Sequence, residues 1–230
     1  MVTALSDGVW WFDLGGVNAY LIDEAVATDG AVSGLTLVDA GMPWHGTKLA
    51  AAITETGYEP ADIERIVLTH YDLDHVGALA DLASDATIYV GAADAPFVTG
   101  DERPPWRNHK GLFQRLVGGF VTPPEHPVET VADGDTVGSF TVYETPGHTP
   151  GHVAFVSEAA GVAMLGDLVR ESGGSLTPSP WFISYDTDAV ETSIADLAER
   201  APAFDVLGIG HGRPFSRGGR DRLDRLAATV

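Results

Sequence analysis

The chain has 230 residues, of which 44% are hydrophobic and 20% are charged, a composition typical of a folded globular domain. No apolar run approaches the roughly 18 residues that a membrane span needs, and no signal peptide is visible, so a cytoplasmic location is expected. The absence of cysteine excludes disulfides, thiolate metal sites and a cysteine nucleophile. Any bound metal must therefore be held by His, Asp or Glu.

Acidic residues outnumber basic residues 33 to 13, which gives a net charge of -20. This charge repels nucleic acid and anionic membranes, so neither is expected as a partner. A small-molecule substrate is expected instead. The only lysines are Lys48 and Lys110. An acidic, lysine-poor surface is typical of a halophile, whose salt screens self-repulsion, although an ordinary acidic protein from a GC-rich genome has the same composition.

Short β-rich runs alternate with segments of helical spacing along most of the chain, which is typical of a layered α/β domain. The order is a strand-rich half, an insertion, and a second strand-rich half followed by helices. It predicts two sheets packed face to face with helices outside. The predicted strands are residues 9–12, 19–22, 35–39, 66–69, 87–90, 128–131, 136–145, 152–156, 161–165 and 206–209. The predicted helices are residues 44–55, 75–82, 188–200 and 219–229.

The proline-rich segment 92–127 interrupts this alternation and contains a short helix-like piece at 112–117. No composition shift marks a second domain, so residues 1–230 are expected to form one domain with an inserted segment. This segment either folds over a site like a lid or is a structural excursion. Four of its residues form a group that either recognises an anionic substrate or belongs to a solvated loop: Trp106, Arg107, His109 and Lys110.

The strongest local signal is the sequence THYDLDHVG at 69–77, which places His70, Asp72, Asp74 and His75 between a buried strand and a helix. Ligands collect where the strands of α/β folds end. Imidazole nitrogen and carboxylate oxygen are the donors that zinc and related metals prefer. The alternative is a polar helix cap formed by one of the two aspartates.

Three more potential ligands follow other predicted strands: His148 in TPGHTPGH, Asp167 in GD and His211 in GHG. Glycines beside them allow the backbone to turn tightly. His152, the second histidine of TPGHTPGH, either orients a ligand or has a structural role. The combination predicts a metal site assembled from four separate strand ends.

These motifs resemble the metallo-β-lactamase-fold hydrolases, which carry H-x-H-x-D-H followed by a lone His, a lone Asp and a final His. The resemblance runs along nearly the whole chain and includes VNAYLI at 17–22 and LVDAG at 37–41. It implies an αββα sandwich of two mixed β-sheets with outer helices and a dinuclear site at one edge. It also implies two divalent ions, with zinc as the first expectation, which activate a shared water. By this resemblance the first metal is held by His70 and His148, the second by Asp74, His75 and His211, and Asp167 bridges them.

One position departs from the family pattern, because Asp72 replaces the second histidine and the motif reads H-x-D-x-D-H. A carboxylate at this point favours iron or manganese relative to zinc. Three outcomes are open: Asp72 binds the first metal, the first site is weak and only the second is filled, or one metal lies on His70, His148 and Asp167. The last arrangement is that of the mononuclear iron persulfide dioxygenases of the superfamily.

The resulting hypothesis is a metal-dependent hydrolase of a small ester, thioester, lactone or β-lactam, in which Asp74 orients the nucleophile and Tyr185 could donate to an oxyanion. TPGHTPGH is similar to the hydroxyacyl-thioester hydrolases of the glyoxalase II group, but no glutathione-binding C-terminal domain is evident. The alternative is a mononuclear iron oxidoreductase of the persulfide dioxygenase type, and a third possibility is a binding protein with a crippled site. A homodimer is possible.

The remaining candidates carry weaker signals. Trp181 and Phe182 follow Asp167 in a proline-rich loop and either form a pocket wall or pack into the core. Arg213 follows a predicted ligand and could pair with a metal-binding carboxylate or with a charge on the substrate. His45 and His126 are expected on the surface.

Overall fold

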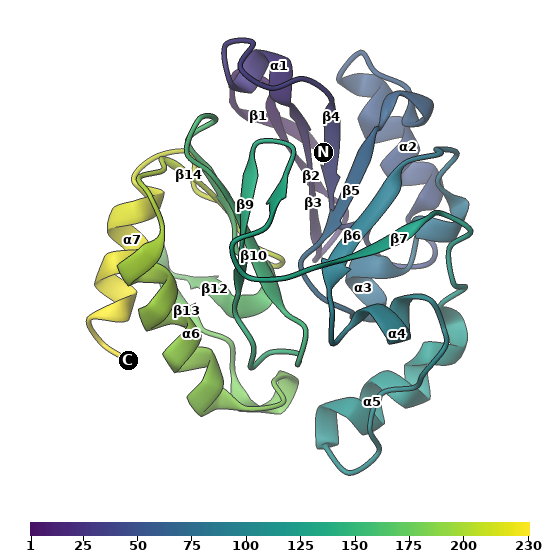
Figure 1. The fold of residues 1–230 in the computed structure, drawn as a ribbon, viewed down its shortest axis with the longest axis vertical. Helices are drawn as coiled ribbons and strands as arrows, with labels where there is room; N and C mark the ends of the chain where they lie inside the picture. The colour runs from purple at the N-terminus through teal and green to yellow at the C-terminus, as the bar shows by residue number, and fades with distance from the viewer.

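The computed structural model describes residues 1–230 and contains two β-sheets packed face to face, with helices on both outer faces (Figure 1). This is the predicted αββα sandwich. The first sheet consists of β1 (Val2–Ser6), β2 (Val9–Asp13), β3 (Asn18–Asp23), β4 (Leu35–Val38), β5 (Arg65–Leu68), β6 (Thr87–Gly91) and β7 (Val128–Val131). The second consists of β14 (Val206–Gly208), β11 (Val162–Met164), β10 (Val153–Ser157), β9 (Phe140–Glu144) and β8 (Thr136–Val137).

Both sheets are mixed. In the first, β1 to β4 pair antiparallel and β4 to β7 pair parallel. In the second, only β11 and β14 pair parallel. A separate hairpin is formed by β12 (Val169–Ser172) and β13 (Ser175–Pro178). The helices are α1 (Glu24–Ala27), α2 (Gly46–Glu55), α3 (Leu73–Val76), α4 (Ala95–Val98), α5 (His109–Val117), α6 (Thr187–Arg200) and α7 (Gly219–Ala227).

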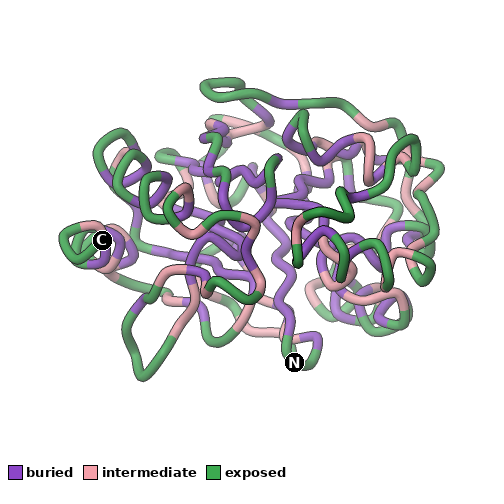
Figure 2. Tube along the Cα trace, turned by 90° about the horizontal axis from the view of Figure 1, so that it is seen from below, coloured by how far each residue is buried: buried purple, intermediate pink, exposed green.

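The core is divided into three hydrophobic clusters, one for each boundary between adjacent layers. Because side chains alternate across a strand, each buried strand contributes to two clusters. In β3, Leu21 packs in the cluster that includes α2, whereas Tyr20 faces the cluster between the sheets. In β10, Val156 faces the cluster that includes α6 and α7, and Phe155 faces the middle one. Figure 2 shows the consequence, with buried segments in the centre and exposed segments around the rim.

Two predicted elements are wrong in extent. The helix predicted at 75–82 is instead the short α3, which spans Leu73–Val76, followed by a separate 3-10 turn at Leu79–Asp81. Between them the chain passes so close to Pro43 that only a glycine fits at Gly77, where a Cβ would lie 2.3 Å from the Pro43 nitrogen. The strand predicted at 136–145 is two strands, β8 and β9, because Gly138 turns the chain with a φ of 58°. Strand β1 and the β12–β13 hairpin were not predicted.

The segment 92–127 folds into α4, α5 and short turns next to the ends of β6 and β7 (Figure 1). Helix α5 is capped by Asn108, the residue just before it, whose side chain accepts hydrogen bonds from the backbone nitrogens of Lys110 and Gly111. The role of this segment as a lid stays a prediction, as does the single domain. None of the helices has the length and apolar run that a membrane crossing requires.

In the cluster between the two sheets, we expect the fully buried aromatic rings to contribute most to stability. Phe155 is fully buried and packs edge-to-face on Phe140, with ring centroids 6.4 Å apart. We expect Phe155→Ala to lower the free energy of unfolding by about 3–5 kcal/mol, measured by urea denaturation of the metal-free protein. The control is Phe120→Ala, at a ring that is 69% exposed, which should change it by less than about 0.5 kcal/mol. Equal effects of the two changes would contradict this packing.

Candidate metal centre

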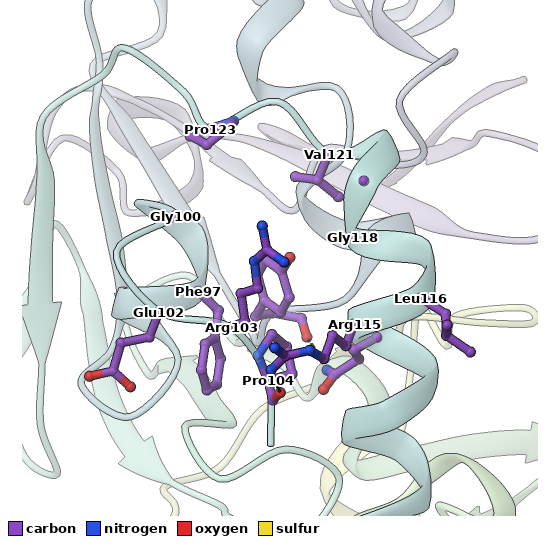
Figure 3. A pocket seen from close by; sticks show the side chains of 13 residues that line it. Phe97, Gly100, Glu102, Arg103, Pro104, Arg115, Leu116, Gly118, Val121 and Pro123 are labelled. Atoms are coloured by element: carbon purple, nitrogen blue, oxygen red, sulfur yellow. Dashed lines mark hydrogen bonds between the residues drawn. The ribbon is translucent and has the colours of Figure 1, made fainter. Parts of the chain in front are cut away.

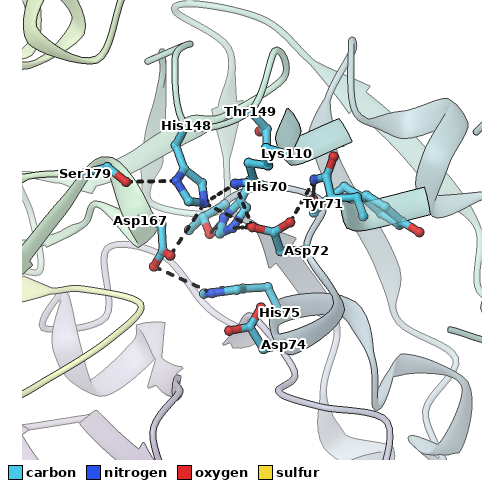
Figure 4. Close-up of polar contacts among 12 residues, drawn as sticks. His70, Tyr71, Asp72, Asp74, His75, Lys110, His148, Thr149, Asp167 and Ser179 are labelled. Carbon is cyan, nitrogen blue, oxygen red and sulfur yellow. Dashed lines mark hydrogen bonds and ion pairs between the residues drawn. The ribbon is translucent and has the colours of Figure 1, made fainter. Parts of the chain in front are cut away.

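Loops at one edge of both sheets bring the predicted ligands together (Figure 4). His70 lies two residues after the end of β5, and His75 belongs to α3. His148 lies between β9 and β10, Asp167 belongs to the turn that follows β11, and His211 follows β14. The rigid strands therefore fix the positions of side chains that are far apart in the sequence.

The donor atoms are spaced as metal ligands are. His211 Nε2 lies 3.2 Å from Asp74 Oδ2 and 3.2 Å from Asp167 Oδ2, which is also 3.5 Å from His148 Nε2. Tetrahedral coordination with bonds of about 2.0–2.1 Å places donor atoms roughly 3.3 Å apart. Three sets of side chains could hold a metal, and one of them, formed by His70, His75 and Asp167, overlaps with the two groups on either side of it. The first group is His70, Asp72 and His148, and the second group is Asp74, His75 and His211.

Every histidine in the two groups is oriented through its Nδ1 atom, which leaves Nε2 to face the centre. Such contacts fix the ring and the tautomer of metal-binding histidines. The Nδ1 partners are Thr69 Oγ1 for His70 (2.9 Å), Asp39 Oδ2 for His75 (2.8 Å), Ser179 Oγ for His148 (2.9 Å) and the Gly16 carbonyl for His211 (2.6 Å).

The second group fits a divalent metal. His75 Nε2 and Asp167 Oδ1 are buried, lie 3.7 Å apart and have no hydrogen-bond partner. Buried polar atoms are almost always partnered, and an ion at this point would satisfy both. Asp74 and His211 complete a set of two imidazoles and two carboxylates, which suits zinc and also iron or manganese.

The carboxylates of the second group stabilise positive charge. Burial by itself lowers the pKa of His75, but Asp39 and Asp74 raise it to about 9. Burial also opposes charge on His211, whereas Asp167 and Asp74 raise its pKa to about 11. Burial disfavours the Asp167 carboxylate, yet His211 holds its pKa well below the usual range. The same negative charge would attract a metal cation, which binds in competition with protons.

The first group is different, because Lys110 reaches into it from α5. Asp72 Oδ2 lies 3.2 Å from His70 Nε2, 3.0 Å from His148 Nε2 and 2.8 Å from Lys110 Nζ. Lys110 Nζ is also 2.5 Å from His148 Nε2, and the residue is only 4% exposed. The interpretation of Lys110 as part of a solvated loop is wrong, since its charge is turned inward. With the ammonium in this position the first group does not fit a divalent ion.

The electrostatics of the first group follow from this contact. Burial raises the pKa of Asp72, but Lys110 and the neighbouring histidines hold it well below its usual range. Burial and Lys110 together lower the pKa of His148. Burial, reinforced by His75, holds the pKa of His70 well below its usual range. The group is therefore a carboxylate paired with an ammonium and flanked by neutral imidazoles.

Three supporting residues were not predicted. Asp39 follows β4 and accepts hydrogen bonds from the backbone nitrogen and the hydroxyl of Thr69 besides contacting His75. Asp94 follows β6 and accepts from Tyr71 N, Thr149 Oγ1 and Gly151 N, which joins the two loops that carry His70 and His148. Gln114 Nε2 donates to Asp72 Oδ1 at 2.8 Å. The two aspartates share the signal of the predicted ligands, a carboxylate just after a strand, whereas Gln114 has none.

Two predicted residues support the site without facing its centre. Tyr185 donates its hydroxyl hydrogen to Gln114 Oε1, so it reaches Asp72 only through that amide. Its role as an oxyanion donor stays a prediction. His152 is buried, stacks on His70 with centroids 5.2 Å apart, and contacts Thr145 Oγ1 through Nδ1.

The weaker candidates lie outside the donor set. His45 is buried and accepts from Met42 N, so the expectation that it lies on the surface is wrong. Its ring packs against the backbone at Gly41, where a Cβ would lie only 2.9 Å from His45 Nδ1. His126 is half-buried, and Arg213 is exposed without an ion pair to any ligand. The other candidates of the segment 92–127 are exposed. Arg107 lies over the ring of Trp106, and His109 contacts the Trp181 carbonyl.

A cavity of about 290 Å³ opens on both ligand groups. Part of its wall is apolar and comes from the loop after β4, from α3, from α5 and from the turn after β13. Its apolar side chains are Met42, Leu73, Phe113, Val117, Phe182 and Ile183, and Arg170 adds a positive charge. A second cavity of about 260 Å³ lies beside Arg103 and Arg115 and holds none of the predicted ligands (Figure 3).

Comparison with known proteins identifies the family. The family model described as "Metallo-beta-lactamase superfamily" matches residues 12–211. The chain belongs to the metallo-β-lactamase superfamily, a superfamily of metal-dependent hydrolases. It is 30% identical over 217 residues to the probable metallo-hydrolase YflN of Bacillus subtilis, covering 83% of this chain and 80% of YflN.

Two further members show the range of the superfamily. A hydroxyacylglutathione hydrolase of Erwinia tasmaniensis is 33% identical over 122 residues, or 50% of this chain and 36% of that enzyme. The crystal structure of TTHA1623, in a di-iron-bound form, is 29% identical with a TM-score of 0.66, covering 90% of this chain and 93% of that one. The metal of this chain is therefore not fixed as zinc by its relatives.

The contact of Asp39 with His75 should matter for metal affinity. We expect Asp39→Asn to weaken zinc binding roughly 10- to 100-fold, because the amide no longer holds the imidazole as a carboxylate does. Affinity is measured by competition with a chromophoric chelator. The matched control is Asp29→Asn, since Asp29 is exposed and shares the left-handed backbone conformation, with φ of 51° against 56°. Unchanged affinity in Asp39→Asn would refute the assignment.

Proposed function

We propose that this chain hydrolyses a small ester, thioester, lactone or β-lactam by means of a divalent metal in the second group. The observation that supports this most is the pair of buried atoms without partners, His75 Nε2 and Asp167 Oδ1, beside an apolar-walled cavity. A metal there supplies a Lewis acid and a water of lowered pKa. Zinc is the first expectation, and the carboxylate donors keep iron and manganese open.

The side chains around the second group have separate tasks. Asp74 is partly exposed to the cavity, so its carboxylate can accept a hydrogen bond from the attacking water and orient it. His211 Nε2 lies 3.2 Å from Asp74 Oδ2, which limits the positions that this carboxylate can adopt. Asp167 lies at the buried end of the site, where its contacts with His148 and His211 fix the position of its carboxylate.

The cavity supports a substrate with an apolar acyl group. Phe113 and Val117 of α5 line it together with Phe182 and Ile183, and the exposed rings of Phe113 and Phe182 offer apolar surface that an acyl group could cover. Arg170 has no ion pair within the protein and lines the same cavity. Its guanidinium can bind a carboxylate, which is the product that hydrolysis of an ester, thioester or lactone releases.

Hydrolysis is preferred to sulfur oxidation because several relatives, among them YflN, are named probable metallo-hydrolases and another is a hydroxyacylglutathione hydrolase. The hydroxyacylglutathione hydrolase matches only half of this chain, so its substrate is not carried over. Thioesters remain one of the proposed classes on the chemistry of the site.

Metal removal tests the function directly. We expect an aryl ester, thioester, lactone or β-lactam to be hydrolysed, the activity to disappear after dialysis against a chelator, and zinc, manganese or iron to restore it. His75→Ala should lower kcat/KM on the order of 100-fold or more, because it removes a metal ligand. Full activity in the chelator-treated protein, or no turnover on any substrate with any metal, would contradict the proposal.

The apolar wall should govern acyl-chain preference. We expect Phe182→Ala to raise KM for a hexanoyl ester about fivefold, because about 1 kcal/mol of apolar contact is lost. KM for the acetyl ester should change little, since a short acyl group does not reach the ring. Phe120→Ala, at an exposed ring outside the cavity, is the control. Equal changes for both esters would show that Phe182 does not contact the acyl group.

A further inference from the structure

We infer that the ammonium of Lys110 takes the place of the first metal of a dinuclear centre, so that this chain holds one divalent ion, in the second group. Lys110 Nζ lies 2.8 Å from Asp72 Oδ2 and 2.5 Å from His148 Nε2, two of the three residues that could hold the first metal (Figure 4). This inference concerns metal number and goes beyond the proposed reaction.

The charges of the first group are balanced without a metal. A buried ammonium is costly unless a carboxylate pairs with it and its hydrogen bonds are satisfied. Asp72, which stands where the family pattern has a neutral histidine, supplies that carboxylate, and His148 Nε2 supplies an acceptor. The carboxylate of Asp72 and the inward ammonium of Lys110 are therefore complementary in charge.

Helix α5 holds Lys110 in this position. Asn108 caps the helix at Lys110 N, and its own amide donates to the Tyr185 carbonyl. Gln114 lies one turn after Lys110 on the same face of the helix. It donates to Asp72 Oδ1, and Tyr185 donates to Gln114 Oε1. Two residues of α5 thus occupy both oxygens of the Asp72 carboxylate.

A second divalent ion could enter the first group only against this arrangement. It would be repelled by the adjacent ammonium, or it would have to displace Lys110 and leave a lysine buried without its counter-charge. The second group has no such obstacle, because its carboxylates pair only with histidines. The difference between the two groups predicts strong binding of one ion and exclusion of the other.

Zinc titration of the metal-free protein tests the inference. Stoichiometry is measured by calorimetry and by elemental analysis after equilibrium dialysis, at fixed pH. We expect about one zinc per chain for the unmodified protein. For Lys110→Met, which keeps the length of the side chain but not its charge, we expect the number of bound zinc ions to rise towards two per chain. The control is Lys48→Met, at the only other lysine, which is exposed and should leave the count at one. Circular dichroism checks folding, and Lys110→Gln replaces Lys110→Met if the latter does not fold.

The outcomes separate this inference from the proposed function. Two tightly bound zinc ions in the unmodified protein, or a count that stays at one when Lys110 is replaced, would overturn the role of Lys110 and leave the hydrolase proposal intact. A chain that binds no zinc, manganese or iron would overturn both. A rise from one to two in the Lys110 variant alone supports the inference.

Discussion

Buried negative charge is the constraint on which the organisation of this site depends. Asp39 and Asp167 are buried and Asp72 is largely covered at the meeting edge of two sheets, where an unbalanced carboxylate would be strongly destabilising. The protein balances them in two ways. One group uses a lysine from α5, and the other surrounds its carboxylates with imidazoles and leaves inward-facing atoms that a metal cation would satisfy.

The fold makes this concentration of charge possible. Three apolar clusters hold the sheets and helices rigid, so the polar residues can be confined to loops at one edge. The contacts of Asp94 join the two loops that carry His70 and His148, and they align the ligands of the two sheets. The helix α5 then closes one side of the cavity. Stability and chemistry are therefore located in different layers of the same sandwich.

Much of this could be predicted from the sequence, for identifiable reasons. Strands buried on both faces leave short apolar runs, and residues such as His70 and Asp167 stand directly after them, beside turns. The position of Lys110 could not be predicted, because its direction depends on how α5 docks through Asn108 and Gln114. The burial of His45 likewise depends on a close approach to Gly41. These are tertiary contacts without a periodic signal in the sequence.

The location of a bound metal tests the account most directly. Crystals grown with zinc should give one anomalous-scattering peak at the zinc edge, within about 2.0–2.2 Å of donor atoms from Asp74, His75, His211 and Asp167. Lys110 Nζ should remain beside Asp72 in the same crystals. Zinc peaks only at other positions, or none at all in a folded protein, would contradict the claim that these charges are arranged around a cation.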